Sequence, residues 1–106
     1  TMAIKIYWTN FAKKQLRNIF DYYKTNASPQ IAQNIVVGIV EKVNSLEFQT
    51  EIGQKEELLL DRKENFRYLV FKKYKIIYWF NKDKNRIEIS DVFDARQNPI
   101  KIKRQK

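Results

Sequence analysis

The spacing of apolar and polar positions over the first 27 residues predicts a short strand followed by a helix. Apolar Ile4, Ile6 and Trp8 alternate with Lys5 and Tyr7, which is typical of a strand. The following apolar residues recur with helical spacing and form one stripe, made of Ala12, Leu16, Ile19, Phe20 and Tyr23. Thr9 or Asn10 is expected to cap this helix, because each offers a side-chain oxygen to the unpaired amides of the first turn.

A second helix is predicted to begin at Ser28-Pro29, where a capping hydroxyl precedes a proline at the first helical position. Its apolar stripe comprises Ile31, Ile35, Ile39, Val43 and Leu46. The stripe predicts that the helix ends near Glu47. Gly38 inside it costs about 1 kcal/mol relative to alanine. We expect close contact with the first helix to offset that cost, so the two helices should form an antiparallel hairpin.

After Gly53 the apolar period changes from 3.6 to 2, which predicts four consecutive strands: Glu56–Asp61, Phe66–Phe71, Tyr74–Asn81 and Arg86–Phe93. Tyr74–Asn81 is apolar on both faces and should lie in the middle of the sheet. The order β-α-α-β-β-β-β predicts an α+β fold, in which a helical hairpin packs on one face of a mostly antiparallel sheet. The other face is expected to be partly open. The tail 97–106 is predicted to be an edge strand, a helical turn or mobile.

Composition narrows the possible chemistry. The 106 residues include neither cysteine nor histidine. This excludes catalysis by a Ser-His-Asp or Cys-His arrangement and any metal site with cysteine or histidine ligands. We therefore expect neither a metal nor a cofactor. The length predicts a single domain over residues 2–106. No apolar run approaches the roughly 20 residues that span a bilayer, and no signal-peptide pattern is present. We expect a cytoplasmic protein that makes no membrane contact.

Positive charge is concentrated in the second half of the chain. The formal net charge is +9. Residues 1–57 hold seven basic and six acidic side chains, whereas residues 58–106 hold fourteen and six. A one-sided field of this kind attracts nucleic acid, an anionic surface or an acidic protein. The same pattern is also typical of a well-solvated surface.

Three segments together resemble the RelE/ParE toxin superfamily: WTNFAKKQL at 8–16, RYLVFKKYKIIY at 67–78 and IEISDVFDARQNP at 87–99. The most specific pieces are the Arg…Tyr-Lys-x-x-Tyr pair of strands and the Asp-x-Arg that follows the last strand. The resemblance covers essentially the whole chain. It implies the RelE/ParE toxin fold and the toxin half of a type II toxin–antitoxin system. Such toxins are small basic proteins that an acidic antitoxin inhibits by wrapping around them in a hetero-oligomer.

The resemblance implies two possible targets. ParE-like members poison DNA gyrase, whereas RelE-like members are metal-independent endoribonucleases that cut mRNA on the ribosome. The RelE-like pattern has a tyrosine near the C-terminus, where this chain has Ile100 and Ile102. Lys75 also replaces an arginine of that pattern, which removes a bidentate phosphate contact. These differences favour the ParE-like reading. A third alternative is an inactive member that only binds its antitoxin.

Read residue by residue, the resemblance implies candidate catalytic roles for Arg67, Lys75 and Arg96. Metal-free RNA cleavage needs a base, an acid and cations near the phosphate. Candidate contacts to nucleic acid or target are Lys72, Lys73, Lys101, Lys103 and Arg104. All of these side chains also fit a solvated face of a sheet. We expect them to gather on one patch, and replacement of any of the three catalytic candidates by alanine to abolish growth arrest.

Overall fold

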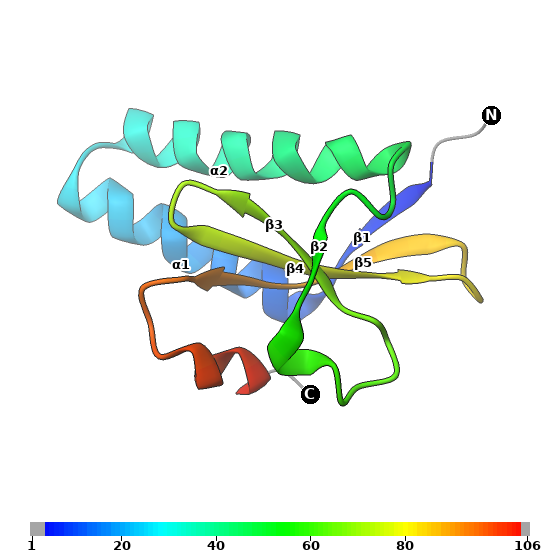
Figure 1. Ribbon diagram of the computed structural model, residues 1–106. Helices are drawn as coiled ribbons and strands as arrows, with labels where there is room; N and C mark the ends of the chain where they lie inside the picture. The colour runs from blue at the N-terminus through cyan, green and yellow to red at the C-terminus, as the bar shows by residue number, and fades with distance from the viewer. Residues whose placement is uncertain (1–3, 105–106) are drawn as a thin grey trace.

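The predicted helical hairpin is present in the computed structural model, which describes residues 4–104 (Figure 1). Helix α1 spans Asn10–Asn26 and α2 spans Pro29–Asn44. The helical conformation continues to the predicted end at Glu47 as a 3-10 turn, η1, over Ser45–Glu47. No helix of the described residues is both long and apolar enough to cross a membrane. The single domain predicted for 2–106 remains a prediction, and residues 2, 3, 105 and 106 lie outside the described range.

Side-chain caps fix where both helices begin. Thr9 caps α1, since its Oγ1 accepts a hydrogen bond of 3.1 Å from the amide of Ala12. Ser28 caps α2 in the same way, accepting a bond of 3.1 Å from the amide of Ile31. Of the two caps considered for the first helix, Thr9 is therefore the one used. The Thr9 hydroxyl also donates to the carbonyl of Ile89 at 2.9 Å, which ties the start of α1 to the sheet.

Five strands form one mixed sheet: β1 (Lys5–Trp8), β2 (Gln54–Lys55), β3 (Arg67–Phe71), β4 (Tyr74–Asn81) and β5 (Arg86–Asp94). Their spatial order is β1-β5-β4-β3-β2, with β1 parallel to β5 and every other pair antiparallel. The doubly apolar strand β4 is central, as predicted. The α+β architecture and the mostly antiparallel sheet are confirmed.

The strand predicted over Glu56–Asp61 is wrong. In its place the two-residue β2 is followed by a 3-10 turn, η2, over Glu57–Leu59. The carboxylate of Glu56 accepts a bond of 3.2 Å from the amide of Leu58. A local bond of this kind gives the backbone an alternative to a strand ladder. The tail forms one of the predicted alternatives, a helical turn, η3, over Pro99–Arg104.

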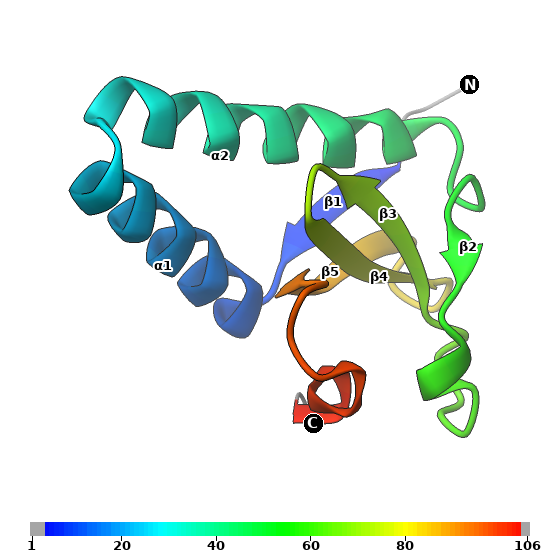
Figure 2. The ribbon, with the colours of Figure 1, turned by 60° about the vertical axis from the view of Figure 1, so that its left-hand side comes forward.

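Apolar side chains pack on both faces of the sheet. The main core lies between the helices and the sheet and includes Ile39 and Val43 of α2 together with Ile76, Tyr78 and Ile89. A smaller cluster on the opposite face contains Leu59, Ile77, Phe93 and Ile102. The second cluster joins η2 and η3 to the sheet. Both turns lie on the side of the sheet opposite α2 (Figure 2). The face that was expected to be partly open is therefore partly covered by these two turns.

Gly38 makes a close contact, but not with the helix that the sequence suggested. A Cβ atom at this position would collide with the ring of Phe71 on β3. The glycine thus lets α2 approach the sheet rather than α1. The expectation of a close contact is confirmed, and its assignment to the helix–helix interface is wrong.

Candidate functional site

Arg67, the first residue of β3, fastens the loop that precedes β2. Its Nη1 donates to the carbonyl of Gly53 at 2.8 Å and to that of Glu51 at 3.4 Å. The same loop is held by Tyr78, whose hydroxyl accepts from the Gly53 amide at 2.9 Å and donates to the Thr50 carbonyl at 3.0 Å. Burial raises the pKa of Tyr78, which keeps this hydroxyl protonated and able to donate. The half-buried Arg67 and the buried Tyr78 thus hold the same loop in place.

Lys75, near the start of β4, is held by a buried carboxylate. Its Nζ lies 3.0 Å from Oε1 of Glu56, a side chain that is only 3% exposed. The same ammonium lies 4.3 Å from the centroid of the Tyr68 ring. A polar hollow of about 370 Å³ adjoins these groups. The role of Glu56 as the partner of Lys75 was not predicted, because the sequence assigned residues 56–61 to a strand.

Arg96 follows β5 and is the most exposed of the three catalytic candidates. Its side chain is 65% exposed and forms an ion pair of 3.0 Å with Asp94. The Asp94 carboxylate also accepts from the backbone amide of Arg96 at 2.9 Å. The hydrogen bond from Arg96 lowers the pKa of the Asp94 carboxyl, and the same bond raises the pKa of the guanidinium. This pair closes the turn after β5.

The three catalytic candidates do not share one pocket. Along a strand, successive side chains point to opposite faces. The register pairs Arg67 with Tyr78 of the main core, whereas Lys75 pairs with Phe93 of the smaller cluster. Arg67 therefore lies on the helix-facing side of the sheet and Lys75 on the other. Arg96 lies beside α1 in a third location. The prediction that these three residues gather on one patch is therefore wrong. The role of each residue in toxicity stays a prediction.

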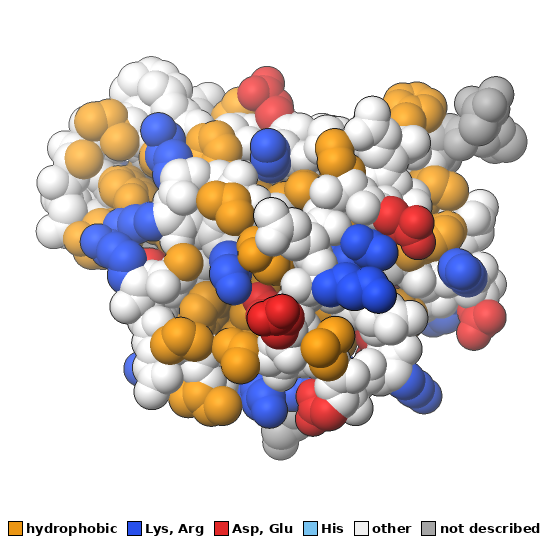
Figure 3. Space-filling model, viewed as in Figure 1, with side chains coloured by type: hydrophobic (Ala, Val, Ile, Leu, Met, Phe, Trp, Pro, Cys, Tyr) orange, Lys and Arg blue, Asp and Glu red, His pale blue; other side chains and the backbone are white. Residues whose placement is uncertain are grey.

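The five candidate binding residues also divide into two groups. Lys72, Lys101 and Lys103 are exposed. Lys72 has a φ of 52°, so the tight β3–β4 turn, which contains no glycine, places a lysine in the left-handed region. The ammonium of Lys72 lies 5.6 Å from the centroid of the Phe71 ring, whereas Lys73 and Arg104 each contact several side chains. In the view of Figure 3, basic side chains are spread among apolar and acidic ones.

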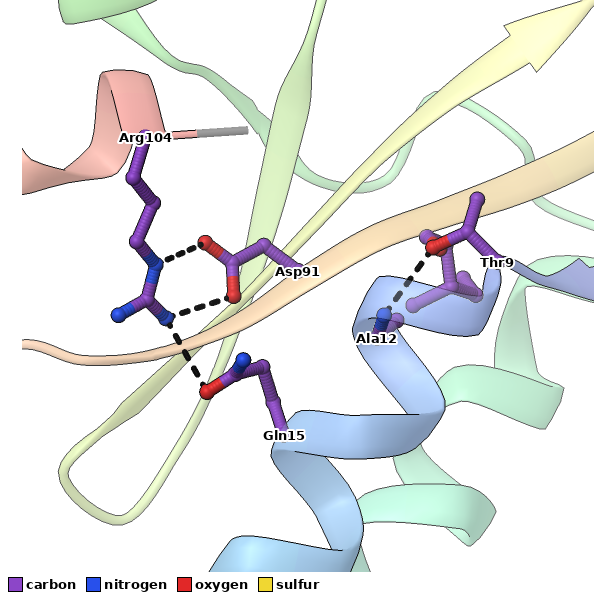
Figure 4. A network of polar contacts seen from close by, with 6 residues as sticks. Thr9, Ala12, Gln15, Asp91 and Arg104 are labelled. Carbon is purple, nitrogen blue, oxygen red and sulfur yellow. Dashed lines mark hydrogen bonds and ion pairs between the residues drawn. The ribbon is translucent and has the colours of Figure 1, made fainter. Parts of the chain in front are cut away.

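The tail is tied to the sheet through an ion pair that the sequence analysis missed. Arg104 of η3 binds the carboxylate of Asp91 through Nη2 at 2.9 Å and Nε at 3.3 Å, and it reaches Gln15 of α1 at 3.5 Å (Figure 4). Asp91 is 1% exposed. Burial raises the pKa of this carboxyl, and the bond from Arg104 opposes that rise. The available signal was an acidic residue at position 91, where the alternation that begins with Ile87 and Ile89 calls for an apolar side chain. A buried charge at such a position requires a partner.

Lys73 lies within a cage of tyrosines at the end of the sheet. Its Nζ is 5.3 Å from the ring centroid of Tyr23, 5.6 Å from that of Tyr74 and 5.7 Å from that of Tyr22. The hydroxyls of Tyr23 and Tyr74 lie 3.5 Å apart. Burial raises the pKa of Tyr74, whereas the hydrogen bond from Tyr74 lowers that of Tyr23. Among residues 4–104, no group of acidic side chains is arranged to hold a metal ion.

The same architecture is found in a known protein. Among solved structures, a chain from the chromosomal ParDE toxin–antitoxin system of P. aeruginosa has the same fold, with a TM-score of 0.73 and 21% sequence identity. The match covers 90% of this chain and 99% of that one. No curated protein sequence matches this chain.

The sequence model of the ParE toxin of the type II toxin–antitoxin system parDE matches residues 6–99. The chain therefore belongs to the ParE toxin family. This result confirms the resemblance to the RelE/ParE superfamily and the fold that it implied. The protein is the toxin component of a type II system, and the partner of such a toxin is an antitoxin.

Proposed function

We propose that this toxin poisons DNA gyrase by binding, without breaking or forming a covalent bond itself. The observation that carries the proposal is the separation of Arg67, Lys75 and Arg96. A metal-independent nuclease must bring a base, an acid and cations to one phosphate. Here two of the candidates lie on opposite faces of the sheet and the third lies beside α1. Membership of the ParE family supports the same target.

The contacts of the individual residues also favour binding over catalysis. Lys75 is an ammonium in its ion pair with Glu56, and an ammonium has no lone pair with which to accept a proton. Nη1 of Arg67 donates to two backbone carbonyls, which ties this side chain to the loop before β2. We assign both residues to the support of the surface and place the contact with gyrase on the exposed Lys72, Lys101 and Lys103. The setting of this activity is the cytoplasm.

The antitoxin is proposed to be acidic and to bind as a hetero-oligomer over the basic, partly apolar surface near η2 and η3. Leu60, which follows η2, and Ile100 of η3 are both exposed there, and Lys101 follows Ile100 in the chain. Because exposed ion pairs are screened by salt, we expect the affinity of the complex to fall steadily as salt is raised toward about 1 M. Titration of purified toxin with antitoxin at several salt concentrations measures this. An affinity independent of salt would contradict the electrostatic part.

Replacement of the exposed lysines tests the proposed contact with gyrase. For a surface that binds without chemistry, single changes of Lys72, Lys101 or Lys103 to glutamine should weaken gyrase inhibition only a few-fold each, and the triple change much more. Lys42→Gln on α2 is the control for loss of one positive charge. Inhibition that survives the triple change unaltered would place the contact elsewhere. Cleavage of ribosome-bound mRNA that disappears with Lys75→Ala alone would favour the endonuclease instead.

A further inference from the structure

A hollow of about 210 Å³ between α1 and the end of β5 is not used by the proposed contact with gyrase. It is lined by polar, cationic, acidic and aromatic side chains that include Gln15, Asn18, Tyr22, Lys73, Asp94 and Arg96. They come from α1, the β3–β4 turn and the segment after β5. The amide of Ala95 donates to the carbonyl of Lys73 at 2.8 Å, which fixes two of these segments to each other. The wall of the hollow is therefore held by backbone as well as by side chains.

Lys73 supplies this hollow with a positioned positive charge. Its ammonium lies within 5.3 to 5.7 Å of three tyrosine ring centroids. Among the residues that the structure describes, no carboxylate lies within ion-pair distance of it. Arg96 brings a second cation, which is already balanced by Asp94. An incoming anion thus meets a charge that is held in place, and less side-chain freedom is lost on binding.

The α1 side of the hollow offers an aromatic ring and two amides. Gln15, Asn18 and Tyr22 are three and four residues apart, so they line one side of the helix. Tyr22 is 54% exposed, yet its ring is fixed by an edge-to-face contact with Tyr23, with centroids 5.2 Å apart. An exposed but fixed ring beside a cation is the arrangement on which single-stranded nucleic acids stack their bases.

We propose that this hollow binds one nucleotide of single-stranded nucleic acid. The phosphate lies against Lys73 and Arg96, the base stacks on Tyr22, and the amides of Gln15 and Asn18 meet its edge. An acidic side chain of a protein would use the cations but would make no use of the Tyr22 ring or of the Asn18 amide, so a nucleotide fits the lining better. The inference does not depend on which enzyme the toxin inhibits.

The test is fluorescence anisotropy of labelled ten-nucleotide oligomers, one of deoxythymidine and one of uridine, with the purified full chain at 0.1 M salt. Tyr22→Ala should weaken binding about tenfold, because stacking on one ring contributes about 1–3 kcal/mol per base. Tyr22→Phe should bind as the native protein does. Lys73→Gln should reduce the slope of log affinity against log salt by about 0.7, the value for one phosphate contact on a single strand.

Two control variants separate this site from general attraction to a basic protein. Lys42→Gln removes an exposed charge on α2, and Phe48→Ala removes an exposed ring; both should change affinity less than twofold. Thermal melting establishes that each variant is folded. The tighter of the two oligomers identifies DNA or RNA as the ligand. Three results would overturn the proposal: no binding of either oligomer, equal losses in the controls, or a polyglutamate peptide whose binding depends on Tyr22 in the same way.

Discussion

Replacing Arg104 by alanine is expected to lower the free energy of unfolding by about 3 kcal/mol, because the Asp91 carboxylate would remain buried without its partner. Asp91 lies inside β5, and Arg104 is its only ion-pair partner among residues 4–104. The side chain of Arg104 is 29% exposed, so we take the lower end of the range for a broken buried pair. Denaturation by urea, followed by circular dichroism, measures the change.

Lys103→Ala is the matched control, since it removes a neighbouring positive charge that is exposed. It should change stability by less than about 0.5 kcal/mol. Adding Asp91→Asn to Arg104→Ala should recover part of the loss, because the buried group is then neutral. An Arg104→Ala protein as stable as the control would contradict the assigned role of the ion pair.

The Arg104→Ala deficit should also depend on pH. Burial raises the folded-state pKa of Asp91 above the ordinary value of an aspartate. A carboxyl with a raised pKa favours folding most at low pH, and this contribution is lost as the pH rises through the folded-state pKa. The bond from Arg104 lowers the pKa of Asp91, so removing Arg104 raises this pKa further. Protonated Asp91 then favours folding up to a higher pH. The difference in stability between variant and native protein should therefore shrink as the pH falls toward about 4.

Gly53→Ala is the second large effect, with an expected loss of about 2 kcal/mol from overpacking. A Cβ atom at this position would lie 2.7 Å from the carbonyl oxygen of Tyr68 and 2.7 Å from the hydroxyl of Tyr78. The first of these atoms belongs to the backbone of β3 and cannot move without disturbing the sheet. The second belongs to the hydrogen bonds that hold the loop before β2.

Gly38→Ala is the natural comparison, because its new methyl group would meet only the side-chain ring of Phe71. The half-buried side chain of Phe71 can move away through a change of χ1. Alanine is also favoured over glycine within a helix by about 1 kcal/mol. We therefore expect a clearly smaller loss at Gly38 than at Gly53, measured by the same denaturation experiment. Equal losses would mean that the Tyr78 support contributes little.

The regular elements could be predicted because their patterns are long and local. Both helices carry an apolar stripe and a capping residue, and β4 is apolar on both faces. Glu56–Asp61 could not be predicted, since its conformation depends on a side chain that bonds to the next residues and on a cluster completed by Ile102, more than 40 residues later. The family resemblance was carried by segments from three separate elements and was confirmed over residues 6–99.

The arrangement of the site was less predictable than the fold. Whether Arg67 and Lys75 share a face depends on the register of the β3–β4 hairpin, and a shift of one residue in the turn reverses the answer. The partner of Asp91 comes from a tail whose conformation the sequence left open. The cage around Lys73 joins α1 to the β3–β4 turn, a contact between residues about 50 positions apart. Such contacts arise from tertiary packing and leave no local pattern.

The central claim is that the toxin acts on gyrase by binding. The most direct test adds the purified toxin to two reactions, DNA supercoiling by gyrase and translation of a defined mRNA on ribosomes. We predict that supercoiling is inhibited, that covalent gyrase–DNA complexes accumulate, and that the mRNA stays intact. Cleaved mRNA together with unaffected gyrase would contradict the claim and favour the endonuclease. No effect on either reaction would also contradict it and would favour a protein that only binds its antitoxin.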